Sequence, residues 1–134
     1  MMTNEQRYDR LRNRILDGAS AREKLMAGVR KAETAAFAAG AILIMCGGRL
    51  GAVLARVAAG QAGSSAIPRI IFLIAAGAAS YLAATRAMAA RRAMLEEARR
   101  IQAGLRSDRS AFQAVKDRMA KDAEPYDWAR EASA

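Results

Sequence analysis

Histidine is absent from the chain, and cysteine occurs once, as Cys46. A single cysteine excludes an intramolecular disulfide, and a structural zinc site needs about four Cys, His or carboxylate ligands. Without histidine the chain also lacks the commonest general base of enzymes. The sequence therefore predicts a non-enzymatic protein with no catalytic residues, no metal, no cofactor and no small-molecule substrate.

Aromatic residues are also scarce, at 5% of 134 residues, whereas 34 residues are alanine. Alanine is the best helix former, but it buries little apolar area. We therefore expect an all-α protein with close contacts between helices and a thin core. No break in composition separates two cores, so a single domain over residues 1–134 is expected.

The chain carries 22 Lys and Arg against 13 Asp and Glu, a formal net charge of +9. Such an excess favours negatively charged partners. Nucleic acid is the less suitable one, because acidic residues are mixed among the basic ones and no platform of aromatic and basic residues occurs. Membrane lipid with anionic headgroups is therefore the predicted partner.

Breaker residues divide the chain into five predicted segments. Thr3 and Gln6 have the spacing of a capping box, and Asp17-Gly18 ends the short helix that they begin. The segments are an N-terminal amphipathic helix (1–19), a long helix (20–59), an outer loop (60–67), a second long helix (68–103) and a C-terminal helix with a tail (104–134).

Capping and helix-breaking residues also set the remaining predicted boundaries of the helices. Ser20 and Glu23 again have capping-box spacing. Glycine, serine and proline cluster between Gly60 and Pro68, and a proline suits the first turn of a helix. The breakers that end the second long helix and the C-terminal helix are Gly104 with Ser107-Asp108 and Glu124-Pro125.

Each long helix contains an apolar run. Residues 34–48 and 70–85 hold no charge over fifteen and sixteen positions. A membrane span needs about 20 residues, so the predicted spans are extended to about 33–56 and 67–88. A helix of about 40 residues is about 60 Å long, twice the hydrocarbon thickness of about 30 Å. The prediction is a two-span transmembrane helical hairpin whose long helices extend into cytoplasmic stalks, with short flanking amphipathic helices.

Arg49 makes the first span marginal. Seven strongly apolar residues at about −0.5 kcal/mol each favour its insertion by about 3.5 kcal/mol, and a central arginine costs about 2.5 to 3.5 kcal/mol. The second span has a similar gain, and its arginines lie at its ends, where they can reach the interface. We therefore expect the two spans to insert as a pair.

The distribution of basic residues predicts the orientation. Residues 1–31 contain eight Lys or Arg and residues 86–134 contain eleven, whereas residues 57–68 contain none. Basic residues near membrane spans favour the cytoplasmic side. Both termini are therefore expected in the cytoplasm, with the spans in a membrane of the bacterial inner-membrane type.

The order of charges also suggests how the two arms pair. If residue i faces residue 126−i, Arg30 lies opposite Glu96, and Glu33 lies opposite Ala93 beside Arg92. The stalks are then complementary in charge, although exposed ion pairs contribute only about 0–1 kcal/mol.

Small residues form a stripe on the first span, where they would let another helix approach closely. The predicted helix-packing residues are Gly40, Gly47, Gly51 and Ala55 of the first span and Gly77 of the second. Two interpretations stay open: contact within the hairpin, between the first-span stripe and Gly77, or contact with another protein chain.

Arg49 and Arg56 are seven residues apart and share a helix face. An arginine inside a membrane is a functional candidate, which contacts lipid phosphate, an acidic partner or a water-filled pore. Alternatively, the first span ends near Arg49, and residues 49–59 lie along the outer interface. Arg91 and Arg92 follow the second span, where they could bind anionic headgroups, although neighbouring acidic residues weaken this interpretation.

Apolar residues at helical or heptad spacing continue outside the spans. They predict a cytoplasmic face for association, made of Tyr8, Leu11, Ile15, Ile101, Leu105, Phe112, Val115 and Met119.

Together these features predict a small integral membrane protein that acts by helix association, as a homo-oligomer or as an accessory subunit of a larger membrane complex. Two spans with a short outer loop and charged cytoplasmic ends resemble the layout of two-span phage holins, which implies a pore. Two hydrophobic helices joined by a short loop are also similar to conjugative pilins, although the long charged ends argue against a pilin. No sequence motif accompanies either resemblance. A further alternative is a soluble alanine-rich coiled-coil adaptor, but residues 72–84 offer it almost no polar face.

Overall fold

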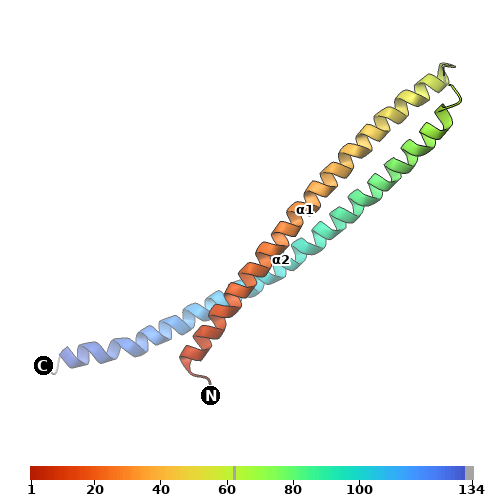
Figure 1. Cartoon of the computed structure of the whole chain (residues 1–134). Coiled ribbons are helices and arrows are strands. Elements are labelled where there is room, and N and C mark those ends of the chain that lie inside the picture. The colour runs from red at the N-terminus through yellow and green to blue at the C-terminus, as the bar shows by residue number, and fades with distance from the viewer. Residues whose placement is uncertain (62, 132–134) are drawn as a thin grey trace. The chain divides into compact units, whose positions relative to one another are not determined.

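Two long α-helices joined by a short loop make up the fold (Figure 1). The structure is a computed structural model that describes residues 1–61 and 63–131, with side chains described as far as Ala123. Helix α1 spans Asn4–Ala58 and helix α2 spans Ala66–Glu131. The helices pack as an antiparallel hairpin, so the predicted all-α hairpin is confirmed.

Both ends of α1 are capped by local hydrogen bonds. At its start, the amide of Gln6 donates to Thr3 Oγ1 and the amide of Thr3 donates to Gln6 Oε1, each at 3.3 Å, which is the predicted capping box. At its end, Gly60 adopts a φ of 71°, and the amide of Gln61 donates to the carbonyl of Arg56 at 3.0 Å. This is a Schellman motif, in which a left-handed glycine ends the helix.

The predicted break at Asp17-Gly18 is wrong, because α1 runs through it without interruption. Ser20 does not cap a new helix. Its hydroxyl donates to the carbonyl of Asp17 at 3.2 Å, as serines inside helices do. Gly18 lies on the inner face of α1, where a Cβ would come within 2.8 Å of Leu105 Cδ2. This glycine therefore makes room for a leucine of α2 and does not end the helix.

The predicted breaks in α2 at Gly104, Ser107-Asp108 and Glu124-Pro125 are also wrong, because α2 runs on to Glu131. A glycine inside a helix costs only about 1 kcal/mol relative to alanine, and long helical flanks absorb that cost. A proline costs about 3 kcal/mol, because it removes a hydrogen bond and its ring crowds the carbonyl four residues earlier. Here the carbonyl without a donor belongs to Lys121, which is exposed and can bond to water. Residues 132–134 of the predicted tail lie outside the described residues.

The inward-facing residues of both helices follow a heptad pattern, which we call the heptad seam. Most of them recur in alternating steps of three and four residues, apart from one step of seven between Gly18 and Leu25, and Ala21 and Gly28 lie half-buried beside this pattern. In α1 the seam comprises Tyr8, Leu11, Ile15, Gly18, Leu25, Val29, Ala32, Ala36, Ala39, Leu43, Cys46, Leu50 and Val53. In α2 it comprises Ile70, Leu73, Gly77, Ser80, Ala84, Ala87, Arg91, Met94, Ala98, Ile101, Leu105, Asp108, Phe112, Val115 and Met119.

Contacts along the hairpin cluster into two compact units. The loop unit consists of residues 27–95, and the terminal unit combines residues 1–26 with residues from 96 onwards. The single domain predicted from composition stays a prediction. Each unit has a thin core, and the buried apolar residues among those described are Val29, Ala39, Ala98 and Leu105.

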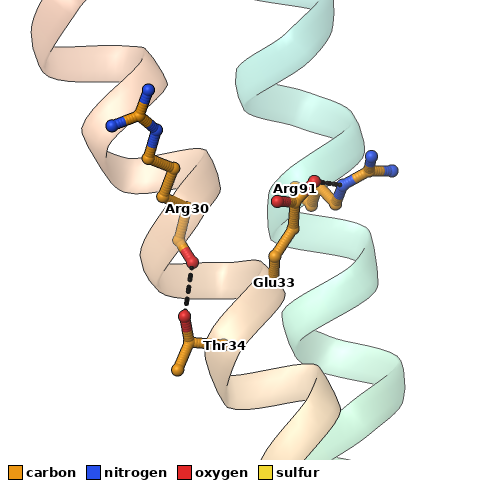
Figure 2. Close-up of polar contacts among 4 residues, drawn as sticks. All are labelled: Arg30, Glu33, Thr34 and Arg91. Atoms are coloured by element: carbon orange, nitrogen blue, oxygen red, sulfur yellow. Dashed lines mark hydrogen bonds and ion pairs between the residues drawn. The ribbon is translucent and has the colours of Figure 1, made fainter.

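In the loop unit, two contacts define how α1 and α2 pair. A Cβ on Gly28 would lie 2.7 Å from Met94 Sδ. Nearer the loop, Arg91 Nε donates to Glu33 Oε1 at 2.8 Å, while Thr34 Oγ1 donates to the carbonyl of Arg30 within α1 (Figure 2). Glu33 therefore meets Arg91, two residues before the Ala93 that the predicted pairing placed opposite it.

Candidate membrane and lipid interface

Large apolar side chains cover the outside of the loop unit, and we call them the apolar belt. They lie away from the heptad seam, so the other helix does not cover them. Phe37 is 82% exposed and Phe72 is 72% exposed. The belt comprises Phe37, Ile42, Ile44, Met45, Leu54 and Val57 of α1 and Ile67, Ile71, Phe72, Ile74, Tyr81 and Leu82 of α2.

Each helix is long and apolar enough to cross a membrane. The core helix of a soluble protein can pass the same test, but most of its apolar residues are then buried. Here 6% of the most apolar 18-residue stretch in α1 is buried, and none of that in α2. Exposed apolar residues on all sides of a helix are typical of a segment that contacts lipid.

Few polar groups interrupt the belt. No acidic residue lies between Glu33 and Glu96. The hydroxyl of Ser80 is partly buried and donates to the carbonyl of Ala76 at 2.8 Å, so it is satisfied inside its own helix. This matters because a polar group without a partner is costly in hydrocarbon.

Charged residues bound the belt at both ends. The Glu33–Arg91 ion pair lies at the end away from the loop (Figure 2), and Arg56 and Arg69 lie near the loop end, where only Val57 and Ile67 of the belt are closer to the loop. At 1.5 Å per residue, the helix between Glu33 and Arg56 is about 34 Å long, and that between Arg69 and Arg91 is about 33 Å long. Both lengths are close to the hydrocarbon thickness of about 30 Å.

Three arginines line one cleft at the loop end of the belt, which we call the arginine cleft. Arg49 and Arg56 come from α1, and Arg69 comes from the first turn of α2. The cleft has a volume of about 650 Å³, and its other lining residues are Ala52, Val53, Pro68, Phe72 and Leu73. Arg56 and Arg69 also line a smaller cavity of about 90 Å³ that extends to Gln61 and Ser65 in the loop.

A second hollow, the apolar groove, lies beside the arginine cleft and shares Leu73 with it. Its volume is about 440 Å³. Gly47 and Gly77 line it from opposite helices, and a Cβ on either would meet nothing within 4 Å. The remaining lining residues are Leu43, Cys46, Leu50, Ile74, Ala78 and Tyr81.

The glycine stripe predicted for helix packing is therefore open in this hairpin. A Cβ added to Gly40, Gly47 or Gly51 would meet nothing within 4 Å, and Ala55 is exposed. These residues do not bring α1 and α2 into close contact, so the interpretation as an internal contact is wrong. Their role in contact with another chain stays a prediction. The glycines that do admit a side chain of the other helix are Gly18 and Gly28.

The residues predicted as a cytoplasmic association face lie on the heptad seam of the terminal unit. Tyr8 stacks on Phe112, with ring centroids 4.6 Å apart, and Leu105 covers Gly18. Leu11, Ile15, Ile101, Val115 and Met119 are all half-buried. The hairpin itself thus occupies this face in the described residues, which leaves less of it for a partner.

The arginines that follow the second span differ in their surroundings. Arg91 is held by Glu33, whereas Arg92 is exposed. Arg69 belongs to the arginine cleft, although sequence reasoning treated it only as the end of a span. A signal was present, because the proposed pairing of i with 126−i already places Arg56 opposite the neighbour of Arg69.

Comparison of the chain with protein-family models, with curated proteins and with solved structures finds no match. The class that the fold and the belt define is a two-helix antiparallel hairpin with helices able to span a membrane.

Proposed function

We propose that this chain is a non-enzymatic integral membrane protein that works by helix association, with copies of itself or as an accessory subunit of a larger membrane complex. The apolar belt is inserted in the bilayer, and the terminal unit is a cytoplasmic stalk. The observation that carries the proposal is the exposure of the belt, with charged residues near its two ends and only Arg49 and Arg86 between them.

The free energy of burying the belt supports a lipid environment. The belt has 12 large apolar side chains, each at least about two-fifths exposed. Moving a large apolar side chain out of water contributes about 1.5–3 kcal/mol when it is fully buried. Even at half that gain, the belt favours transfer to hydrocarbon by on the order of 10 kcal/mol. A soluble adaptor would have to leave this surface in water or cover it with a partner.

Arg49 and Arg86 lie inside the two charged boundaries and must be accommodated. Arg49 lies seven residues, about 10 Å, from Arg56, and Arg86 lies five residues, about 8 Å, from Arg91. A long arginine side chain can reach toward the nearer interface from such depths. The arginine cleft gives Arg49 a place at the loop-side interface, so the first span inserts without an unpaired charge at its centre.

The proposal is tested by locating the loop and the stalk on opposite sides of the membrane. In a Cys46→Ala background, single cysteines replace Ser64 in the loop or Ser107 in the stalk. A membrane-impermeant maleimide should label the Ser64→Cys protein in intact spheroplasts and the Ser107→Cys protein only after lysis. The protein should also stay in the pellet after carbonate extraction, because an integral protein is not released by high pH.

Release of the protein into the carbonate supernatant would refute membrane insertion. Labelling of both cysteines in intact spheroplasts would refute the orientation. Collapse of the membrane potential on expression would favour the holin-like alternative over a passive subunit.

Self-association predicts a specific effect at the open glycines. Gly40→Ile and Gly51→Ile, which lie outside the apolar groove, should abolish cross-linked oligomers, because a bulky side chain prevents another helix from approaching the α1 backbone. Ala38→Ile is the matched control, since it adds an isoleucine to the exposed opposite face of the same span. Cross-linking of the detergent-extracted protein reads the result, and oligomers that persist in the glycine variants would show that the stripe is not the contact.

A further inference from the structure

We infer that the arginine cleft binds the anionic phosphate headgroup of a membrane phospholipid on the loop side, while an acyl chain of the same lipid occupies the apolar groove. The inference rests on the proposed membrane insertion and names the ligand of one site within it. Arg49, Arg56 and Arg69 hold the phosphate, and the small residues Gly47 and Gly77 make room for the chain.

The charge of the cleft calls for an anion from outside the protein. Its three arginines have no acidic residue to neutralise them, because none lies between Glu33 and Glu96. Arginines at the edge of hydrocarbon are stabilised by pairing with a counter-charge. In a bilayer the phosphate groups of lipid are the nearest and most concentrated source of that charge.

The side chains also suit a phosphate in geometry. A guanidinium presents a planar fork of donors that binds phosphate oxygens in pairs, and several forks converging on one cleft favour phosphate over a single carboxylate. Arg49 and Arg56 are two helical turns apart on α1, and Arg69 approaches from α2. The phosphate would thus tie the two helices together at the end where only the loop joins them.

The position of the two hollows, on either side of the shared residue Leu73, distinguishes a lipid from a free anion. Leu73 lines both the cleft and the groove, and the groove is lined mainly by apolar residues. A free phosphate would fill only the cleft. A phospholipid would fill both hollows, with its headgroup in the cleft and an acyl chain in the groove. The chain would cover the backbone at Gly47 and Gly77, where no side chain does so.

Native mass spectrometry of the detergent-purified full chain tests the inference. The probes are phosphatidylglycerol and phosphatidylcholine with identical acyl chains, offered in equal amounts. The protein should retain phosphatidylglycerol in preference, and Arg49→Gln with Arg69→Gln should lower its retention about tenfold or more, the scale set by losing a charge-assisted hydrogen bond. Arg106→Gln with Arg109→Gln is the matched control, because these stalk arginines are exposed and the change in net charge is the same.

A second variant isolates the acyl chain. Gly77→Leu places a side chain in the groove and changes none of the arginines, and its Cβ meets no other atom within 4 Å. It should weaken retention of phosphatidylglycerol while inorganic phosphate, added as competitor, fails to displace the lipid from the unaltered protein. Circular dichroism should show unchanged helicity in every variant.

Equal retention of the two lipids, or equal loss in the stalk control, would overturn the inference. Full displacement by inorganic phosphate together with no effect of Gly77→Leu would overturn the lipid assignment. These results are separable from failure of the proposed function, since release by carbonate contradicts membrane insertion, whereas a membrane-bound protein without lipid preference contradicts only the site.

Discussion

Replacing Ile71 and Ile74 by aspartate should release the protein from the membrane. Both side chains belong to the apolar belt and are more than half exposed, at 62% and 55%. Each aspartate costs about 2.5–3.5 kcal/mol within a span and removes the gain of about 0.5 kcal/mol from the isoleucine. The pair therefore opposes insertion by about 6–8 kcal/mol, against a favourable term of about 3.5 kcal/mol for the second span.

Carbonate extraction and fractionation measure the result: the double variant should move to the supernatant or be degraded. Ala111→Asp with Ala114→Asp adds the same two charges three residues apart at exposed stalk positions and should leave the protein in the pellet. If the belt variant also stayed in the pellet, the belt would not be in contact with lipid.

The hairpin itself was predictable because the loop signals and the apolar runs are strong. Glycine, serine and proline cluster in one place, and Gly60 ends α1 with a left-handed residue as such a cluster suggests. The predicted breaks in the stalk are wrong because they interpret a glycine as a helix breaker by its residue type alone, without regard to the residues around it. Gly18 falls on the heptad seam, where the absence of a side chain is what Leu105 needs. Position in the heptad, and not residue type alone, decides its role.

The arginine cleft was only partly predictable. Arg49 and Arg56 stood out because they interrupt an apolar run, whereas Arg69 was indicated only indirectly, by the predicted pairing that placed its neighbour opposite Arg56. Their convergence depends on the length of the loop and on the register of the two helices. At the Glu33–Arg91 ion pair this register differs from the predicted pairing by about two residues. A shift of this size decides which side chains share a cleft.

The residues that fill the heptad seam change between the two units in a way that matches the proposed solvents. In the loop unit alanines such as Ala36, Ala39, Ala84 and Ala87 fill the middle of the seam, and larger residues fill it beside the loop (Leu43, Leu50, Val53, Ile70 and Leu73). In the terminal unit Leu, Ile, Phe and Tyr predominate. In hydrocarbon no hydrophobic effect drives helices together, so small residues that permit close packing are favoured. In water large apolar side chains contribute more, because their burial removes more surface.

Replacing Leu105 by alanine should therefore be the most damaging single truncation in the stalk. Leu105 is 8% exposed and packs over Gly18, which has no side chain to fill the space that a truncation would leave. Removing a buried leucine side chain costs about 2–5 kcal/mol, and the upper part of that range applies where the site cannot collapse. Hydrogen–deuterium exchange should show faster exchange of residues 5–26 and 96–120, while amides of the loop unit stay protected.

Leu16→Ala is the matched control, because it makes the same substitution in the stalk, on α1 two residues before Gly18, at a side chain that is 58% exposed. It should change the free energy of opening measured by exchange in the stalk by less than about 0.5 kcal/mol, the usual size of the effect of surface substitutions on stability. The swap of Gly18→Leu with Leu105→Gly keeps the composition and moves the leucine to the other helix. It should recover part of the protection that either single change removes, since one leucine again fills one space. Equal exchange in the Leu105→Ala and Leu16→Ala proteins would show that the contact between Gly18 and Leu105 does not hold the stalk together.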